Sequence, residues 1–196
     1  MKAQKVSLIH RGQFLNYYEI KYKDEEGNTK NYELVSKQGN KHSNTPMMTL
    51  DSIGKNITAV VMIVLNSDHT KMLMNKEYRF GVNNWVYNPS AGLIDDGETP
   101  EEAVARELFE ETGLKLTKII TKLPPYYTCA PVTDDLVIPF IVEASGEIIG
   151  SDSIYEVIES KWCTKQEVKE LLLSESNRFS GYMQAIAYMW VFGGDL

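Results

Sequence analysis

The chain of 196 residues is 43% hydrophobic and 24% charged, and its formal net charge at pH 7 is −7. This composition is typical of soluble globular proteins, and the length favours one domain, or one domain with a small appendage. The negative charge argues against a nucleic acid as a partner, and the longest apolar run, residues 59–65, is too short to cross a bilayer. Because residues 6–9 are also too few for the apolar core of a signal peptide, we expect no membrane association and a cytoplasmic location.

The first part of the chain is expected to form a small antiparallel β appendage. Segments rich in β-branched and aromatic residues, separated by turn-forming residues, cover residues 5–11, 16–23 and 29–35. The polar residues 36–46, which include Gly39 and Pro46, predict a mobile connector. We therefore divide the chain into residues 1–46, appendage and connector, and a main domain of residues 47–196.

Further strands and helices alternate along the main domain. Residues 57–65 are almost all apolar, as expected for a strand buried on both faces. The other expected strands cover residues 71–78, 85–87, 117–123, 136–144 and 155–162. Two helices are expected near the end of the chain, from a capping box at Thr164 and Glu167 to about Leu173, and over residues 181–192. The order of strands and helices predicts an α/β fold.

A central helix is predicted over residues 100–112. Thr99 is a good N-cap, Pro100 suits the first helical position, and Glu102 completes a capping box. Gly113 can adopt the left-handed conformation that ends a helix.

Three acidic residues of this helix, Glu107, Glu110 and Glu111, share one face because they lie at i, i+3 and i+4. They lie in the C-terminal half, where the helix dipole disfavours anions, and only Arg106 is nearby to offset their charge. Hard oxygen donors in this arrangement favour a hard divalent cation such as Mg²⁺. The alternative is an ordinary solvated acidic face.

The spacing of residues from Gly92 to Leu114 resembles the signature of the Nudix hydrolases at every position. Its fixed residues are Gly92, Glu98, Arg106, Glu107, Leu108, Glu110, Glu111, Gly113 and Leu114. The resemblance implies the Nudix α/β/α sandwich with a mixed sheet, and hydrolysis of a nucleoside diphosphate linked to another group. It covers the chain from about residue 57 onward.

Weaker features resemble the branch that hydrolyses ADP-ribose and nucleotide sugars. That branch has an N-terminal β appendage that builds a homodimer, and a strand-end Arg that contacts substrate, matched here by Arg79. It also has a Pro in a loop after the signature, matched by Pro131 without the neighbouring Ser and Gly. Asn88 stands where the branch commonly has Glu. Arg79, Pro131 and Asn88 are our candidate substrate-binding residues; the alternative for Arg79 is a surface charge at a strand end.

The resemblance also assigns the metal site. Glu107 and Glu111 are expected as the main ligands of Mg²⁺ or Mn²⁺, with Glu110 as a further ligand. The Ala91 carbonyl would be another ligand and Glu98 would join the network. Arg106 is expected to orient carboxylates rather than to touch substrate. Because this carboxylate face is expected to be solvated, replacing Glu111 should leave the fold intact.

A separate carboxylate is expected to activate the attacking water. In this branch it lies on the loop before the strand predicted over residues 155–162, where Glu156 matches best and Asp152 and Glu147 are alternatives. Glu156 can equally be an exposed residue of an alternating strand.

Three functions remain open. The first is a Mg²⁺-dependent pyrophosphatase of ADP-ribose or a related nucleotide sugar. The second is a hydrolase of another nucleoside diphosphate derivative, such as a UDP-sugar or a dinucleotide. The third is a non-catalytic Nudix domain that binds a nucleotide to regulate another process; the complete set of signature carboxylates argues against it.

Overall fold

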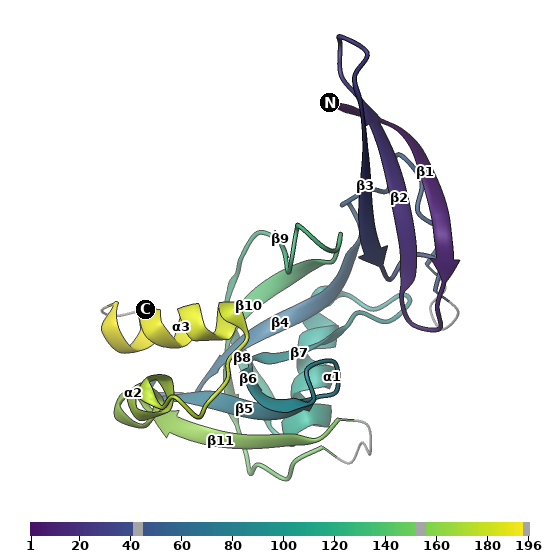
Figure 1. Ribbon diagram of the computed structural model, residues 1–196. Helices are drawn as coiled ribbons and strands as arrows, with labels where there is room; N and C mark the ends of the chain where they lie inside the picture. The colour runs from purple at the N-terminus through teal and green to yellow at the C-terminus, as the bar shows by residue number, and fades with distance from the viewer. Residues whose placement is uncertain (41–44, 152–155, 194–196) are drawn as a thin grey trace. The chain divides into compact units, whose positions relative to one another are not determined.

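The computed structural model describes residues 1–40, 45–151 and 156–193 (Figure 1). The chain divides into two compact units. The first unit contains residues 1–59 and 124–138, and the second contains residues 60–123 and 139–196.

The first unit contains an antiparallel sheet with the strand order β1-β2-β3 (Figure 1). Its strands are β1 (Lys2–Arg11), β2 (Asn16–Lys23) and β3 (Thr29–Ser36). Tyr18, Ile20, Leu34 and Met48 form its buried core. The predicted antiparallel appendage is confirmed, with β1 starting three residues earlier than expected because Lys2 and Ala3 pair with β2.

Residues 36–38, at the end of β3 and just after it, are anchored rather than mobile. Ser36 and Gln38 are buried, and the Gln38 side chain donates to Asp134 Oδ2 at 2.6 Å. Gln38 Oε1 accepts a hydrogen bond from Ser52 Oγ at 2.7 Å. The prediction of a mobile connector is therefore wrong for residues 36–38, and residues 41–44 lie outside the described part of the chain.

A second, mixed sheet has the strand order β11-β5-β4-β10-β8, with β6 paired to β5, β7 to β4 and β9 to β10. Its strands are β4 (Ile57–Leu65), β5 (Lys71–Arg79), β6 (Asn84–Asn88), β7 (Ser90–Leu93), β8 (Lys115–Lys122), β9 (Tyr126–Tyr127), β10 (Leu136–Ser145) and β11 (Ile158–Thr164).

Strands β7 and β9 were not predicted, and several of the other strands have different bounds. Strand β7 was not expected, because a four-residue segment containing Gly92 has no alternating pattern and becomes extended only by pairing with β4. Strand β8 begins at Lys115, where the chain pairs with Ser145 of β10. Strand β11 runs from Ile158 to Thr164, two residues beyond the predicted end at residue 162, since its pairing with β5 continues to Lys71. Tyr155, where the prediction began, lies outside the described residues.

The three helices follow the prediction. They are α1 (Pro100–Thr112), α2 (Lys165–Leu173) and α3 (Gly181–Phe192). The capping boxes of α1 and α2 are both formed, and Gly113 ends α1 with φ of 77°. Among the described residues, none of the helices has the length and apolarity that a membrane crossing requires.

Helices α2 and α3 pack on the sheet through an apolar cluster, which includes Met72 and Met74 of β5, Val168 of α2 and Trp190 of α3. Helix α1 packs against β7 and β8, and its Ala103, Val104 and Leu108 are fully buried. The predicted α/β fold with a mixed sheet is confirmed. Because α1 packs against β7, the acidic residues of the helix lie beside Ser90–Leu93, the strand that precedes the helix in the chain.

Candidate active site

The three acidic residues of α1 differ sharply in exposure. Glu111 is only 7% exposed, whereas the Glu110 side chain is 56% exposed and that of Glu107 is 13% exposed. The expectation of a solvated carboxylate face is therefore wrong for Glu111. Its side chain lies against β7, where the Ala91 N–H donates to Glu111 Oε1 at 3.4 Å.

Arg106 connects the carboxylates. It makes two hydrogen bonds of 2.8 Å to Glu98, from Nε to Oε1 and from Nη2 to Oε2. Its Nη1 donates to Glu107 Oε1 at 2.8 Å and to Glu110 Oε2 at 3.1 Å, and its Nη2 also donates to the Leu93 carbonyl at 2.8 Å. The geometry is that of a residue that orients carboxylates, since its donors are directed at protein oxygens.

The charges of this network shift the pKa values in opposite directions. The hydrogen bonds from Arg106 lower the pKa of Glu98 to about 2. Burial raises the pKa of Glu107, and the charges of Glu110 and Glu156 raise it further, although Arg106 opposes them. Glu98 therefore stays ionised down to low pH. The ionised form of Glu107, in contrast, is disfavoured by burial and by the neighbouring carboxylates.

Glu111 is the most perturbed carboxylate. Burial raises its pKa to about 8, the Ser90 side chain and the Ala91 N–H lower it, and the charges of Glu107 and Glu77 raise it. Its Oε2 is buried and has no hydrogen-bond partner among the described residues. A buried carboxylate oxygen without a partner is costly unless a cation or a proton satisfies it.

Gly92 leaves room for the Glu107 side chain. A Cβ atom at position 92 would collide with the carboxyl group of Glu107, so that group would have to move. Gly92 therefore allows Glu107 its orientation beside β7.

These residues fit a divalent cation. The donors are carboxylate oxygens, which hard cations prefer, and a cation would satisfy the unpartnered oxygen of Glu111. Among the described residues, no group of three acidic, His or Cys side chains forms a ready-made metal cage. Arg106 instead holds one oxygen each of Glu107 and Glu110, so the acids are oriented but do not converge on one point.

The candidate substrate-binding residues lie in both units. Asn88, which is 3% exposed, and Arg79 both donate to Glu77 Oε2, at 3.0 and 2.7 Å. Pro131 lies in the first unit, where its carbonyl accepts a hydrogen bond of 2.8 Å from the Tyr32 hydroxyl. Arg79 and Asn88 are thus joined through one carboxylate oxygen within the second unit.

Two of the candidate bases, Glu147 and Glu156, lie in the segment between β10 and β11. Glu156 is exposed and precedes β11, and its charge contributes to the raised pKa of Glu107. Glu147 is exposed as well, and Asp152 lies outside the described residues. Of the two candidates in the described part of the chain, Glu156 is the one whose charge contributes to the raised pKa of Glu107.

Sequence reasoning missed Glu77, Asn75 and Ser90. Glu77 could have been noticed, because residues 75, 77 and 79 of one strand share a face and Arg79 was already a candidate. The hydrogen bond of 2.8 Å from Asn75 Nδ2 to Ser90 Oγ has no local signal in the sequence.

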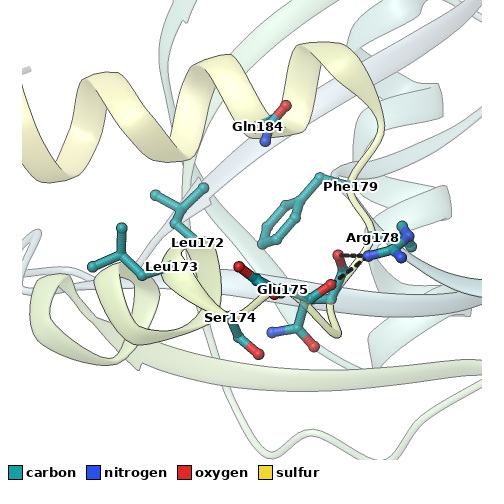
Figure 2. A pocket seen from close by; sticks show the side chains of 8 residues that line it. Leu172, Leu173, Ser174, Glu175, Arg178, Phe179 and Gln184 are labelled. Carbon is teal, nitrogen blue, oxygen red and sulfur yellow. Dashed lines mark hydrogen bonds between the residues drawn. The ribbon is translucent and has the colours of Figure 1, made fainter.

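A separate hollow of about 380 Å³ lies where α2 connects to α3 (Figure 2). Leu172, Phe179 and Gln184 line it together with Arg178, which donates to the carbonyls of Glu175 and Asn177 at 2.6 and 2.9 Å (Figure 2). Because this guanidinium closes the local turn and the lining contains none of the candidate site residues, the hollow is not the predicted active site.

The chain is similar to known proteins in sequence and in fold. The family model of the NUDIX domain matches residues 55–182. A crystal structure of an ADP compounds hydrolase superposes with a TM-score of 0.70, covering 97% of this chain and 92% of that one at 19% sequence identity. This similarity shows the fold alone.

Relatives with known names match parts of the chain. The human NAD-capped RNA hydrolase NUDT12 is 32% identical over 58% of this chain and 23% of its own length. The CMP-5'-(N-acetyl-N-hydroxy-3-aminopropyl)phosphonate hydrolase of Streptomyces rubellomurinus is 30% identical over 67% of this chain and 63% of its own length. The ADP-ribose pyrophosphatase of Bacillus subtilis is 31% identical over 50% of this chain and 56% of its own length. The match therefore spans less than two thirds of each of these relatives.

Proposed function

Because the chain belongs to the NUDIX family and is a Nudix hydrolase, we propose that it cleaves the pyrophosphate bond of ADP-ribose or of a related nucleoside diphosphate sugar. Water attacks one phosphorus atom and the bond from that phosphorus to the bridging oxygen breaks. The products are a nucleoside monophosphate and a sugar phosphate. The observation that carries the proposal is Glu111, whose buried, unpartnered oxygen lies in a helix that also presents Glu107 and Arg106.

Nudix hydrolases generally use divalent metal ions, and we propose Mg²⁺ or Mn²⁺ here. Glu107, Glu110 and Glu111 would hold the cation, together with the Ala91 carbonyl and Glu98. When bound, the cation neutralises charge on the pyrophosphate and orients its oxygens.

The remaining roles follow from charge and exposure. Arg106 keeps Glu98, Glu107 and Glu110 in fixed orientations and is itself saturated by protein acceptors. Glu156 accepts the proton of the attacking water, since it is exposed and is not held by Arg106.

Substrate binding is assigned to Arg79 and Asn88 of the second unit, and a role for Pro131 of the first unit stays a prediction from the sequence. Arg79 is 48% exposed, so its guanidinium can reach a phosphate or a ribose while it remains paired with Glu77. The Bacillus subtilis relative, an ADP-ribose pyrophosphatase, supports ADP-ribose as the first substrate to test.

A second candidate is another nucleoside diphosphate derivative, such as a UDP-sugar or a dinucleotide. It is favoured by Asn88, which replaces the Glu expected for the ADP-ribose branch and donates a hydrogen bond to Glu77. The human relative, an NAD-capped RNA hydrolase, points in the same direction.

A substrate panel tests both candidates. The enzyme is incubated with ADP-ribose, a UDP-sugar, NAD and NAD-capped RNA, each with Mg²⁺, with Mn²⁺ or with a chelator, and the products are separated by chromatography. We expect AMP and ribose phosphate from ADP-ribose, and no product in the chelator. Cleavage of NAD or the UDP-sugar but not of ADP-ribose favours the second candidate. Turnover in excess chelator overturns the metal assignment, and inactivity on every compound overturns the hydrolase proposal.

We also propose a cytoplasmic homodimer that acts on a small molecule. The three strands β1–β3 are few for an independent sheet, so a partner copy would give them a further surface to cover. Sedimentation of a dimer, with twice the 22.3 kDa mass of the chain, supports this assembly, and a monomer at micromolar concentration overturns it.

A further inference from the structure

Three buried polar side chains lie in series behind the acidic face of α1. Asn75 of β5 is 3% exposed, Ser90 of β7 is 2% exposed and Glu111 of α1 is 7% exposed. Asn75 Nδ2 donates to Ser90 Oγ at 2.8 Å, and the next residue of β7, Ala91, donates its N–H to Glu111 Oε1 at 3.4 Å. Strand β7 thus connects the buried amide of Asn75 to the buried carboxylate of Glu111.

The hydrogen bond from Asn75 holds the Ser90 side chain at the start of β7. Ser90 directly precedes Ala91, whose N–H donates to Glu111 Oε1. The bond from Asn75 therefore fixes the part of β7 that contacts the Glu111 carboxylate.

The opposite oxygen of Glu111, Oε2, remains buried without a partner among the described residues. One side of the carboxylate is therefore held by β7, and the other side is left for a ligand. Resting on the proposed function, we propose that Ser90 and Asn75 are positioning residues, which hold the Glu111 carboxylate so that its Oε2 binds the divalent cation. Groups that hydrogen-bond to metal ligands orient them in this way, and their loss weakens metal affinity or activity by roughly 10- to 100-fold.

The chain offers a matched control. Ser160 of β11 pairs directly with Asn75 in the sheet, and its Oγ is also buried without a partner among the described residues. Ser160→Ala and Ser90→Ala therefore each remove a hydroxyl beside Asn75. Only Ser90 lies in β7 next to the N–H that donates to Glu111.

The test measures Mn²⁺ binding to the substrate-free protein from the electron paramagnetic resonance signal of free Mn²⁺. We expect Ser90→Ala to weaken binding roughly 10- to 100-fold. Asn75→Leu should weaken it to a similar extent, because either variant removes the hydrogen bond that holds Ser90. The double variant should be no weaker than Ser90→Ala alone, since Asn75 acts through Ser90. Ser160→Ala should bind Mn²⁺ as the wild type does.

Two outcomes overturn the inference: wild-type Mn²⁺ affinity in Ser90→Ala, or an equal loss in Ser160→Ala, which would indicate general loosening of the sheet. Thermal unfolding without metal checks that each variant is folded. If Ser90→Ala does not fold, the comparison of Asn75→Leu with Ser160→Ala decides, with a loss expected only in the former. A wild-type protein that binds Mn²⁺ but cleaves no substrate would overturn the proposed function and leave this inference standing.

Discussion

Arg106 and Glu98 form a two-bond ion pair, with Nε to Oε1 and Nη2 to Oε2 both at 2.8 Å. Glu98 precedes α1 and Arg106 lies within it, so the pair fixes the chain that enters the helix against the helix itself. Because Arg106 Nη1 continues to Glu107 and Glu110, one guanidinium sets the orientation of three carboxylates.

Arg106→Lys should therefore lower both Mn²⁺ affinity and kcat, roughly 10- to 100-fold, because a single ammonium cannot replace the planar set of donors. Steady-state kinetics and Mn²⁺ titration measure the two effects. Lys122→Gln is the control, since it removes an exposed ion pair of 2.8 Å to Glu101 at the start of the same helix. Equal losses in both variants would show that α1 needs positive charge in general rather than the Arg106 network.

Glu111→Gln should have opposite effects on activity and on the stability of the metal-free protein. The folded-state pKa of about 8 lies above the usual value of 4.5, so the folded chain retains a proton that the unfolded chain releases between these pH values. The free energy of unfolding should consequently fall as the pH rises from about 4.5 to 8, by up to about 1.4 kcal/mol per pH unit from this group.

The variant lacks this loss, so its Tm in chelator should rise relative to the wild type between pH 5 and pH 8. Its hydrolytic activity should fall by more than the roughly 100-fold expected for a residue that only supports a ligand. Thermal scans in chelator at several pH values provide the measurement. A lower Tm than the wild type at pH 8 would make Glu111 a structural residue.

Glu156→Gln should lower kcat strongly and leave KM and Mn²⁺ affinity nearly unchanged, because the carboxylate is exposed and is not held by Arg106. Glu147→Gln, at another exposed carboxylate of the same region, is the matched control. If Asp152→Asn or Glu147→Gln loses kcat instead, the base is one of those residues. Full activity in all three variants would mean that the base is an acid of the signature.

Gln38 should hold the loop that carries Pro131. Its amide donates to Asp134 Oδ2 at 2.6 Å, and Val35 N–H donates to the Val132 carbonyl at 3.0 Å. Gln38→Glu places two carboxylates together in a buried position and should destabilise the chain by about 1–3 kcal/mol.

Adding Asp134→Asn should recover much of this stability, because an amide donor then faces the new carboxylate. Chemical denaturation of the single and double variants gives the two free energies, and Asn31→Ala, at an exposed position of β3, is the control. A double variant as unstable as Gln38→Glu alone would contradict a direct contact between residues 38 and 134.

The local elements were largely predictable from the sequence. Helix α1 runs over the predicted residues because Thr99, Pro100, Glu102 and Gly113 act within one turn of its ends. The spacing of Glu107, Glu110 and Glu111 on one helix determines that they share a face, and it also carries the resemblance to the family.

The tertiary structure alone decided which of these acids is buried and what each of them contacts. Strand β7 becomes a strand by pairing with β4, and its packing on α1 then buries Glu111 and places Gly92 next to the Glu107 carboxyl group. The bonds from Asn75 to Ser90 and from Gln38 to Asp134 join residues 15 and 96 positions apart. Helical spacing and capping act over three or four residues and leave a pattern in the sequence, whereas these contacts depend on strand register and packing, which no local pattern records.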